Sequence, residues 1–216
     1  MKDKNHLIIW SDSCAGQNKN FQMISFYQYL VLKKKFSVID HKFPQVGHSY
    51  LDSDRDFGRI EKVLRKHETI YLPDQYRDLI RSASNINHVT NMENHFRDTD
   101  NLQVQLKVTQ KKKNELNEKI AFRDRIKWIR VQEFGSYFYK DNYDPNTPFK
   151  KVSILQNKQR LPLPENVDFR RVFRKTGKLS EKKVDLQQQM KYIKEDFRWF
   201  YEAVLGEQSQ EEKRNN

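Results

Sequence analysis

Hydrophobic and polar residues follow one another in blocks that predict a strand, a helix and a second strand near the N-terminus. Residues 7–10 form a continuous apolar run, which is typical of a strand buried on both faces. After a polar, turn-forming segment, residues 21–32 are apolar on almost every side, and Asn18 or Asn20 can cap them as a buried helix. Residues 37–43 form a second strand. This order predicts a parallel strand pair within an α/β sheet.

Three further helices are predicted in the middle of the chain. Apolar residues at helical spacing predict a helix at 54–67, and its acidic first turn is favoured by the helix dipole. Pro73 begins a second helix that continues through Ile80. A weaker pattern predicts a third helix at 87–106.

The C-terminal part of the chain predicts short strands followed by one long helix. Residues 126–131 and 137–139 flank a Gly-Ser turn, which predicts a β-hairpin, and residues 152–155 form a further strand. Apolar residues recur at three- and four-residue steps across 186–204, which predicts an amphipathic helix. We therefore expect an α/β core at 1–110, a basic polar connection at 111–124, a small β-rich region with a C-terminal helix at 125–206, and a disordered tail at 207–216.

The composition is that of a basic chain that folds. Its 216 residues include 41 Lys and Arg against 29 Asp and Glu, which gives a net charge of +12, and its 14 Phe, 10 Tyr and 3 Trp are too many for a disordered chain. No apolar run reaches the roughly 18 residues of a membrane span, and the apolar stretch near the N-terminus is too short for a signal peptide. The single cysteine, Cys14, excludes an internal disulfide and a cysteine-based zinc site. We expect an intracellular protein with no membrane partner, whose charge favours binding to a polyanion.

The segment at 11–20 is the first candidate for chemistry. Asp12 follows the first strand, and ligands of open α/β sheets collect at the carboxyl ends of strands. A carboxylate at that position can bind Mg²⁺, and the N-terminus of the next helix can receive a phosphate, with Gln17, Asn18 and Lys19 nearby. The alternative is that Asp12 only closes a turn and the asparagines only cap the helix.

A second acidic segment at 47–62 supplies further possible ligands. It resembles an EF-hand loop, but other residues stand at the positions of the required glycine and bidentate glutamate, so that type of calcium site is excluded. The remaining functional interpretation places Asp54 and His48 beside Asp12 in a divalent-metal site. The alternative is an acidic first helical turn that the helix dipole stabilises.

Basic residues form two clusters that could hold a phosphate backbone. The first spans 107–130, and the second combines aromatic residues with Arg170, Arg171, Arg174 and Lys175. The alternative is that both clusters are solvated surfaces. Standard nucleotide-binding glycine motifs and the His-Glu-x-x-His zinc motif are missing from the sequence.

Two of these segments resemble a known family. Residues 11–20 (SDSCAGQNKN) and 47–62 (GHSYLDSDRDFGRIEK) are similar to motifs of transposon-derived proteins that are abundant in arthropods and labelled as a domain of unknown function. These proteins are in turn similar to ribonuclease-H-like transposases. Ala15 and Ser53 stand where relatives often have Gly and Cys. Longer relatives carry a further acidic motif upstream, so the fold and metal site are expected to be N-terminally incomplete here.

The resemblance implies a ribonuclease-H-like mixed sheet flanked by helices, with catalytic acidic residues that hold Mg²⁺ or Mn²⁺. By that analogy Asp12 and Asp54 are the metal ligands, and His48 is an adjacent catalytic residue. Gln17 and His48 would orient the ligand, and Lys19 would contact a phosphate.

The leading hypothesis is therefore a nuclear, transposable-element-derived domain that processes DNA as a metal-dependent nuclease or strand transferase, with catalytic turnover in this copy left open. Two alternatives remain: a noncatalytic nucleic-acid-binding protein, and a protein-interaction module that uses the C-terminal amphipathic helix.

Overall fold

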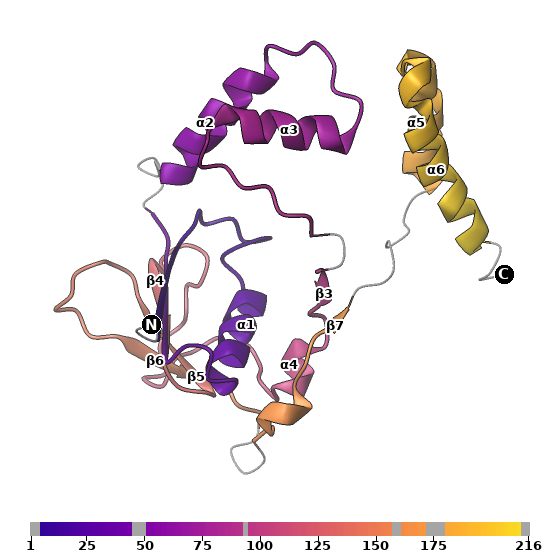
Figure 1. The fold of residues 1–216 in the computed structure, drawn as a ribbon. Helices are drawn as coiled ribbons and strands as arrows, with labels where there is room; N and C mark the ends of the chain where they lie inside the picture. Colours follow the sequence, from indigo (N-terminus) through magenta and orange to yellow (C-terminus); the bar gives the residue numbers. More distant parts are fainter. Residues whose placement is uncertain (1–4, 45–50, 93–94, 157–160, 172–179, 213–216) are drawn as a thin grey trace. The chain divides into compact units, whose positions relative to one another are not determined.

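The computed structural model describes the whole chain except residues 1–4, 45–50, 93–94, 157–160, 172–179 and 213–216. Its contacts divide the chain into two compact units (Figure 1). The first unit comprises Met1–Leu51 and His95–Arg171, and the second comprises Asp52–Asn94 and Val172–Asn216.

A five-stranded mixed sheet forms the centre of the first unit. Its strands, in spatial order, are β1 (His6–Trp10), β2 (Val38–Lys42), β4 (Trp128–Val131), β5 (Ser136–Lys140) and β6 (Lys150–Ser153). The β1–β2 pair is parallel and the other pairs are antiparallel. The predicted parallel pair, the predicted hairpin and the mixed α/β class are therefore confirmed.

The helix α1 (Phe21–Leu32) joins the two parallel strands and has the bounds predicted from the sequence. Asn20 caps it, because its side-chain oxygen accepts a hydrogen bond from the backbone N–H of Met23 at 2.9 Å. Ile24 and Tyr27 of α1 are buried in the core, which also contains the inward-facing residues Ile39, Val131 and Val152 of the sheet. Figure 1 shows α1 beside the strands that it covers.

The side chain of Gln28 connects α1 to the β4–β5 hairpin. It is fully buried, and its Oε1 accepts from the backbone N–H of Gly135 at 2.7 Å while its Nε2 donates to the backbone oxygen of Ser136 at 2.7 Å. Gly135 has a φ of 88°, which favours glycine, and an added Cβ would lie 2.7 Å from the Leu155 side chain. The hairpin turn is therefore constrained by the hydrogen bonds of Gln28 and by its close contact with Leu155.

The helix predicted at 87–106 is wrong. This segment contains a short strand, β3 (Arg97–Asp98), which pairs with β7 (Arg170–Arg171), and a single helical turn, α4 (Leu102–Gln105). Leu102 and Leu106 are buried in the core of the first unit. Two buried leucines four residues apart need only one turn of helix, and this explains the weak pattern in the sequence.

The second unit is helical in its described part. Its helices are α2 (Asp52–Leu64), α3 (Pro73–Ala83), α5 (Ser180–Gln189) and α6 (Glu195–Glu212), and a 3₁₀ turn, η2 (Met190–Tyr192), separates the last two. Tyr71 stacks on Phe197 with 4.9 Å between ring centroids, and the Tyr201 hydroxyl donates to the backbone oxygen of Tyr71. Among the described helices, none combines the length and the apolar character needed to cross a bilayer.

The continuous helix predicted across 186–204 is also wrong, because η2 interrupts it. Ile193 follows the turn in an extended conformation and is 9% exposed, and its backbone oxygen accepts from Nε of Arg198 at 3.0 Å. A new helix then begins with Glu195 and Asp196, which the helix dipole favours in a first turn. The apolar spacing continues across this break, so spacing alone could not reveal it.

We expect Gln28→Ala to lower the free energy of unfolding by about 2–4 kcal/mol, because it leaves a buried N–H and a buried carbonyl without partners. Urea denaturation followed by circular dichroism measures this change. Gln132→Ala, an exposed glutamine of the same hairpin, serves as the control. Equal stability of the two variants would contradict the role assigned to Gln28.

Candidate functional site

The loop between β1 and α1, residues 11–20, contains the first predicted site residue. Asp12 is exposed and lies two residues beyond the carboxyl end of β1. Its Oδ1 accepts hydrogen bonds from the backbone N–H of Cys14 at 3.1 Å and from Nδ2 of Asn18 at 2.7 Å. Asp12 therefore closes the turn, and its carboxylate is also accessible to solvent.

A buried histidine attaches this loop to the rest of the first unit. The ring of His41 is 1% exposed, and its Nε2 lies 2.8 Å from Oγ of Ser11 while its Nδ1 lies 2.8 Å from the hydroxyl of Tyr27. Burial lowers the pKa of His41 to about 4, so the ring is neutral at physiological pH. Burial also raises the pKa of Tyr27, which therefore keeps its proton.

The direction of these hydrogen bonds follows from the neutral ring, which carries one N–H. The buried Tyr27 hydroxyl avoids an unpaired donor by donating to Nδ1, so Nε2–H donates to Ser11 Oγ. The Ser11 hydroxyl in turn donates to the backbone oxygen of Asp12 at 3.0 Å. Because Ser11 Oγ accepts a hydrogen bond from His41 and donates its own hydrogen to a backbone oxygen instead of to the imidazole, the pair is a positioning contact and not an activated nucleophile.

The three predicted phosphate contacts of the loop lie in different surroundings. Lys19 is 4% exposed, and its Nζ donates to the backbone oxygen of Arg123 at 2.7 Å and lies 5.1 Å from the centroid of the Phe43 ring. Desolvation by burial lowers the pKa of Lys19. Asn18 holds Asp12, and Gln17 is exposed. The Lys19 ammonium is therefore already engaged within the protein.

The other residues of the predicted metal site belong to other parts of the chain. Asp54 is exposed on α2, in the second unit, and His48 lies outside the described residues. Within the described ranges, no group of three or more His, Cys, Asp or Glu side chains could hold a metal ion. A site for Mg²⁺ or Mn²⁺ shared by Asp12 and Asp54 therefore stays a prediction.

The predicted basic cluster near residue 170 is described only in part. The backbones of Arg170 and Arg171 form β7, where they pair with Asp98 and Arg97 of β3. Arg174 and Lys175 lie outside the described residues. The contact of this cluster with nucleic acid stays a prediction.

A buried carboxylate, which the sequence analysis did not identify, organises the outer face of the sheet, opposite α1. The side chain of Asp40 is 2% exposed. Arg130 donates from Nε to Oδ1 and from a terminal nitrogen to Oδ2, both at 2.8 Å. Trp128 Nε1 donates to Oδ1 at 2.7 Å, and His6 Nε2 lies 2.7 Å from Oδ2. Burial alone would raise the pKa of Asp40, but these hydrogen bonds outweigh it and lower the pKa.

Aromatic and basic residues alternate in a row across this outer face. In the sheet register Trp10 lies opposite Lys42, Lys42 opposite Trp128, and Trp128 opposite Lys140. We call these four residues the Trp–Lys row. The Nζ of Lys42 lies 4.1 Å from the centroid of the Trp128 ring and 5.4 Å from that of Trp10, and the Nζ of Lys140 lies 5.2 Å from that of Trp128. Lys140 is 4% exposed, and its Nζ donates to the backbone oxygens of Asp144 and Pro145. The accessible part of the row is therefore the exposed Trp10 ring beside the half-buried Lys42.

Phe149 extends this arrangement beyond the row. Its ring packs edge-on against Trp128 with 5.2 Å between the centroids, and the guanidinium of Arg130 lies 4.7 Å from the Phe149 centroid. In the sequence these positions are isolated Trp, Lys and Phe residues that form no motif. The available signals were an aspartate inside an apolar strand and the Trp-x-Arg spacing of residues 128–130.

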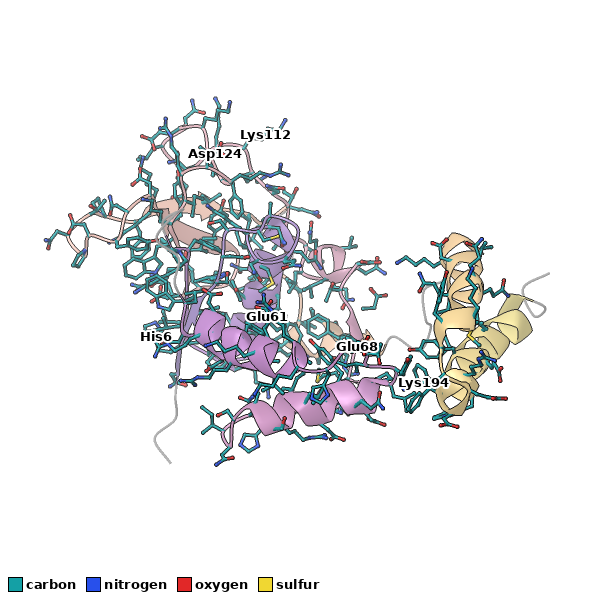
Figure 2. The ribbon with its side chains drawn as sticks, turned by 90° about the horizontal axis from the view of Figure 1, so that it is seen from above. His6, Glu61, Glu68, Lys112, Asp124 and Lys194 are labelled. Carbon is teal, nitrogen blue, oxygen red and sulfur yellow. The ribbon has the colours of Figure 1, made fainter. Side chains whose placement is uncertain are left out.

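A basic groove lies beside the loop at 11–20. It has a volume of about 700 Å³ and is lined by residues of that loop and of the segment 119–125. Lys119, Arg123 and Arg125 contribute to its lining and are exposed. This segment belongs to the predicted basic cluster at 107–130, and Figure 2 labels Lys112 and Asp124 within that cluster. It leads directly into β4, which begins at Trp128.

A family model described as a domain of unknown function (DUF7869) matches residues 3–131, which is more than half of the chain, and the chain therefore belongs to that family. No curated protein and no solved structure matches the chain. The matched range includes the loop at 11–20, Asp40 with its partners, and three residues of the Trp–Lys row. The candidate site therefore lies largely within the family domain.

We expect the stability of the protein to fall between about pH 6.5 and pH 4 because of His41. Unfolded histidine binds a proton near pH 6.5, whereas folded His41 does so only near pH 4. The stabilisation is therefore fully present above pH 6.5 and is lost as the pH falls, by up to about 3 kcal/mol. Urea unfolding at a series of pH values measures this loss.

His41→Gln should flatten that pH dependence, whereas His88→Gln, at an exposed histidine, should leave it unchanged. An identical pH profile for the wild type and His41→Gln would show that His41 is not the group responsible.

Proposed function

We propose that this protein binds nucleic acid through the outer face of the sheet in its first unit. The observation that carries the proposal is the Trp–Lys row, in which two indole rings alternate with two lysines across four adjacent strands. Lysine ammonium groups pair with phosphates, and aromatic rings contact sugars and bases. Trp10 and Lys42 are the members of the row that can make such contacts, because Lys140 is buried and Trp128 is held by Asp40.

The charge of the chain supports the same proposal. The net charge is +12, and the exposed basic side chains of the groove precede β4, which carries Trp128. A polyanion bound to several lysines and arginines releases counterions, so its affinity depends steeply on salt. The motifs at 11–20 and 47–62 support a transposable-element origin, for which DNA in the nucleus is the expected partner.

We expect Lys42→Ala to weaken binding to a labelled DNA oligonucleotide about three- to tenfold and to reduce the slope of log affinity against log salt by about 0.7–0.9. Fluorescence anisotropy at several salt concentrations measures both quantities. The matched control is Lys35→Ala, at an exposed lysine before the amino end of β2. Equal affinity of the two variants would contradict a role for the Trp–Lys row.

A metal-dependent nuclease or strand transferase with a ribonuclease-H-like fold is the second candidate function. One observation favours it: Asp12 presents an exposed carboxylate just beyond the parallel β1–β2 pair. The donor set is incomplete, since Asp12 already shares Oδ1 with two donors and the described residues hold no cluster of three metal-binding side chains.

The nuclease candidate predicts Mg²⁺- or Mn²⁺-dependent cleavage of DNA that Asp12→Asn and Asp54→Asn each abolish, because either change removes an anionic metal ligand. Gel analysis of a labelled substrate measures the cleavage. Asp141→Asn, at an exposed aspartate that follows β5, is the matched control. Unchanged cleavage in both site variants would exclude the assignment, and binding without cleavage by the wild type would favour the noncatalytic function.

A further inference from the structure

The two indole rings of the Trp–Lys row differ in what they can still contact. Trp128 is held in place, because its Nε1 donates to Asp40 and the ammonium groups of Lys42 and Lys140 lie over its ring. Trp10 is 48% exposed. Nζ of Lys42 lies 5.4 Å from the centroid of the Trp10 ring, and the centroid of the Tyr143 ring lies 5.9 Å away. Trp10 therefore has ring surface left for a ligand, whereas Trp128 mainly positions the lysines.

Trp10 lies at the edge of the sheet, on the face opposite α1. Trp10 is the last residue of β1, and β1 is an edge strand of the five-stranded sheet. Within the first unit, α1 packs on the other face, against inward-facing residues such as Ile39. A ligand that lies on Trp10 and Lys42 can therefore continue past the edge of the sheet without meeting α1.

The chemistry of an exposed indole beside an ammonium distinguishes between forms of nucleic acid. In a duplex the faces of the bases are stacked on each other, and only base edges and phosphates are accessible. In a single strand a base can leave the stack and lie on an aromatic ring, and this contact tolerates any base. A lysine next to the ring can pair with the adjoining phosphate, as the 5.4 Å distance between Lys42 Nζ and the Trp10 centroid allows.

From this arrangement we propose that the outer face of the sheet selects single-stranded nucleic acid, with one base stacked on Trp10 and the adjoining phosphate paired with Lys42. The inference rests on the proposed nucleic-acid binding and adds the form of the ligand to it. The ring of Trp10 supplies the selectivity, because a phosphate contact by Lys42 alone would serve a duplex equally well.

The test compares labelled oligonucleotides of one sequence, single-stranded and as a duplex, by fluorescence anisotropy with the full chain. We expect the wild type to bind the single strand more tightly. Trp10→Ala should weaken single-strand binding about tenfold and leave duplex binding unchanged, and Trp10→Phe should restore most of the loss. Phe96→Ala, at an exposed aromatic residue of the same unit (59% exposed), is the matched control and should have no effect.

A second readout does not depend on the stability of Trp10→Ala. Stacking of a base should quench the tryptophan fluorescence of the wild type, and Trp10→Phe should remove most of that quenching. Equal affinity of the wild type for the two forms, or an equal loss for both forms in Trp10→Ala, would overturn the single-strand inference while leaving nucleic-acid binding intact. No binding of either form by the wild type would overturn the proposed function itself.

Discussion

Burying the carboxylate of Asp40 in the sheet costs several kcal/mol unless both of its oxygens are paired. The partners come from two strands, His6 from β1 and Trp128 and Arg130 from β4, and Asp40 itself lies on β2. Satisfying this charge therefore fixes the register of residues more than 80 positions apart in the chain. It also locks the Trp128 ring in the orientation in which Lys42 and Lys140 lie over it.

The strand β2 connects this outer network to the inner side of the sheet. Its alternating residues point to opposite faces, so Asp40 and Lys42 belong to the outer face while Ile39 and His41 belong to the core. The buried His41 forms a hydrogen bond with Ser11, and Ser11 forms one with the backbone of Asp12. These two contacts attach the loop that carries Asp12 to the core. One five-residue strand thus positions both the candidate binding surface and the candidate catalytic carboxylate.

Local pattern was enough to predict the helix at 21–32, the parallel strand pair and the hairpin, because each is determined by contiguous apolar residues and turn chemistry. Local pattern gave wrong helix boundaries at 87–106 and missed the break within 186–204, because tertiary contacts determine the backbone conformation there. Sequence reasoning did not identify the Trp–Lys row for a related reason. Its members come from four strands, and only the sheet register brings them together. Asp12 could be singled out because its position depends only on where one strand ends.

The proposed binding surface and the candidate carboxylate are close in the sequence, because Asp12 follows Trp10, the last residue of β1, by two positions. A strand of nucleic acid stacked on Trp10 would therefore bring its backbone to the loop at 11–20, whether or not that loop performs chemistry. The proposed binding uses Trp10 and Lys42, which belong to the row that Asp40 supports from within the sheet. Cleavage would require, in addition, acidic groups from outside this loop, because a single carboxylate that already accepts two hydrogen bonds supplies too few ligands for a hard cation. For this reason we propose nucleic-acid binding as the function that the geometry supports best, and cleavage by Asp12 and Asp54 stays a prediction.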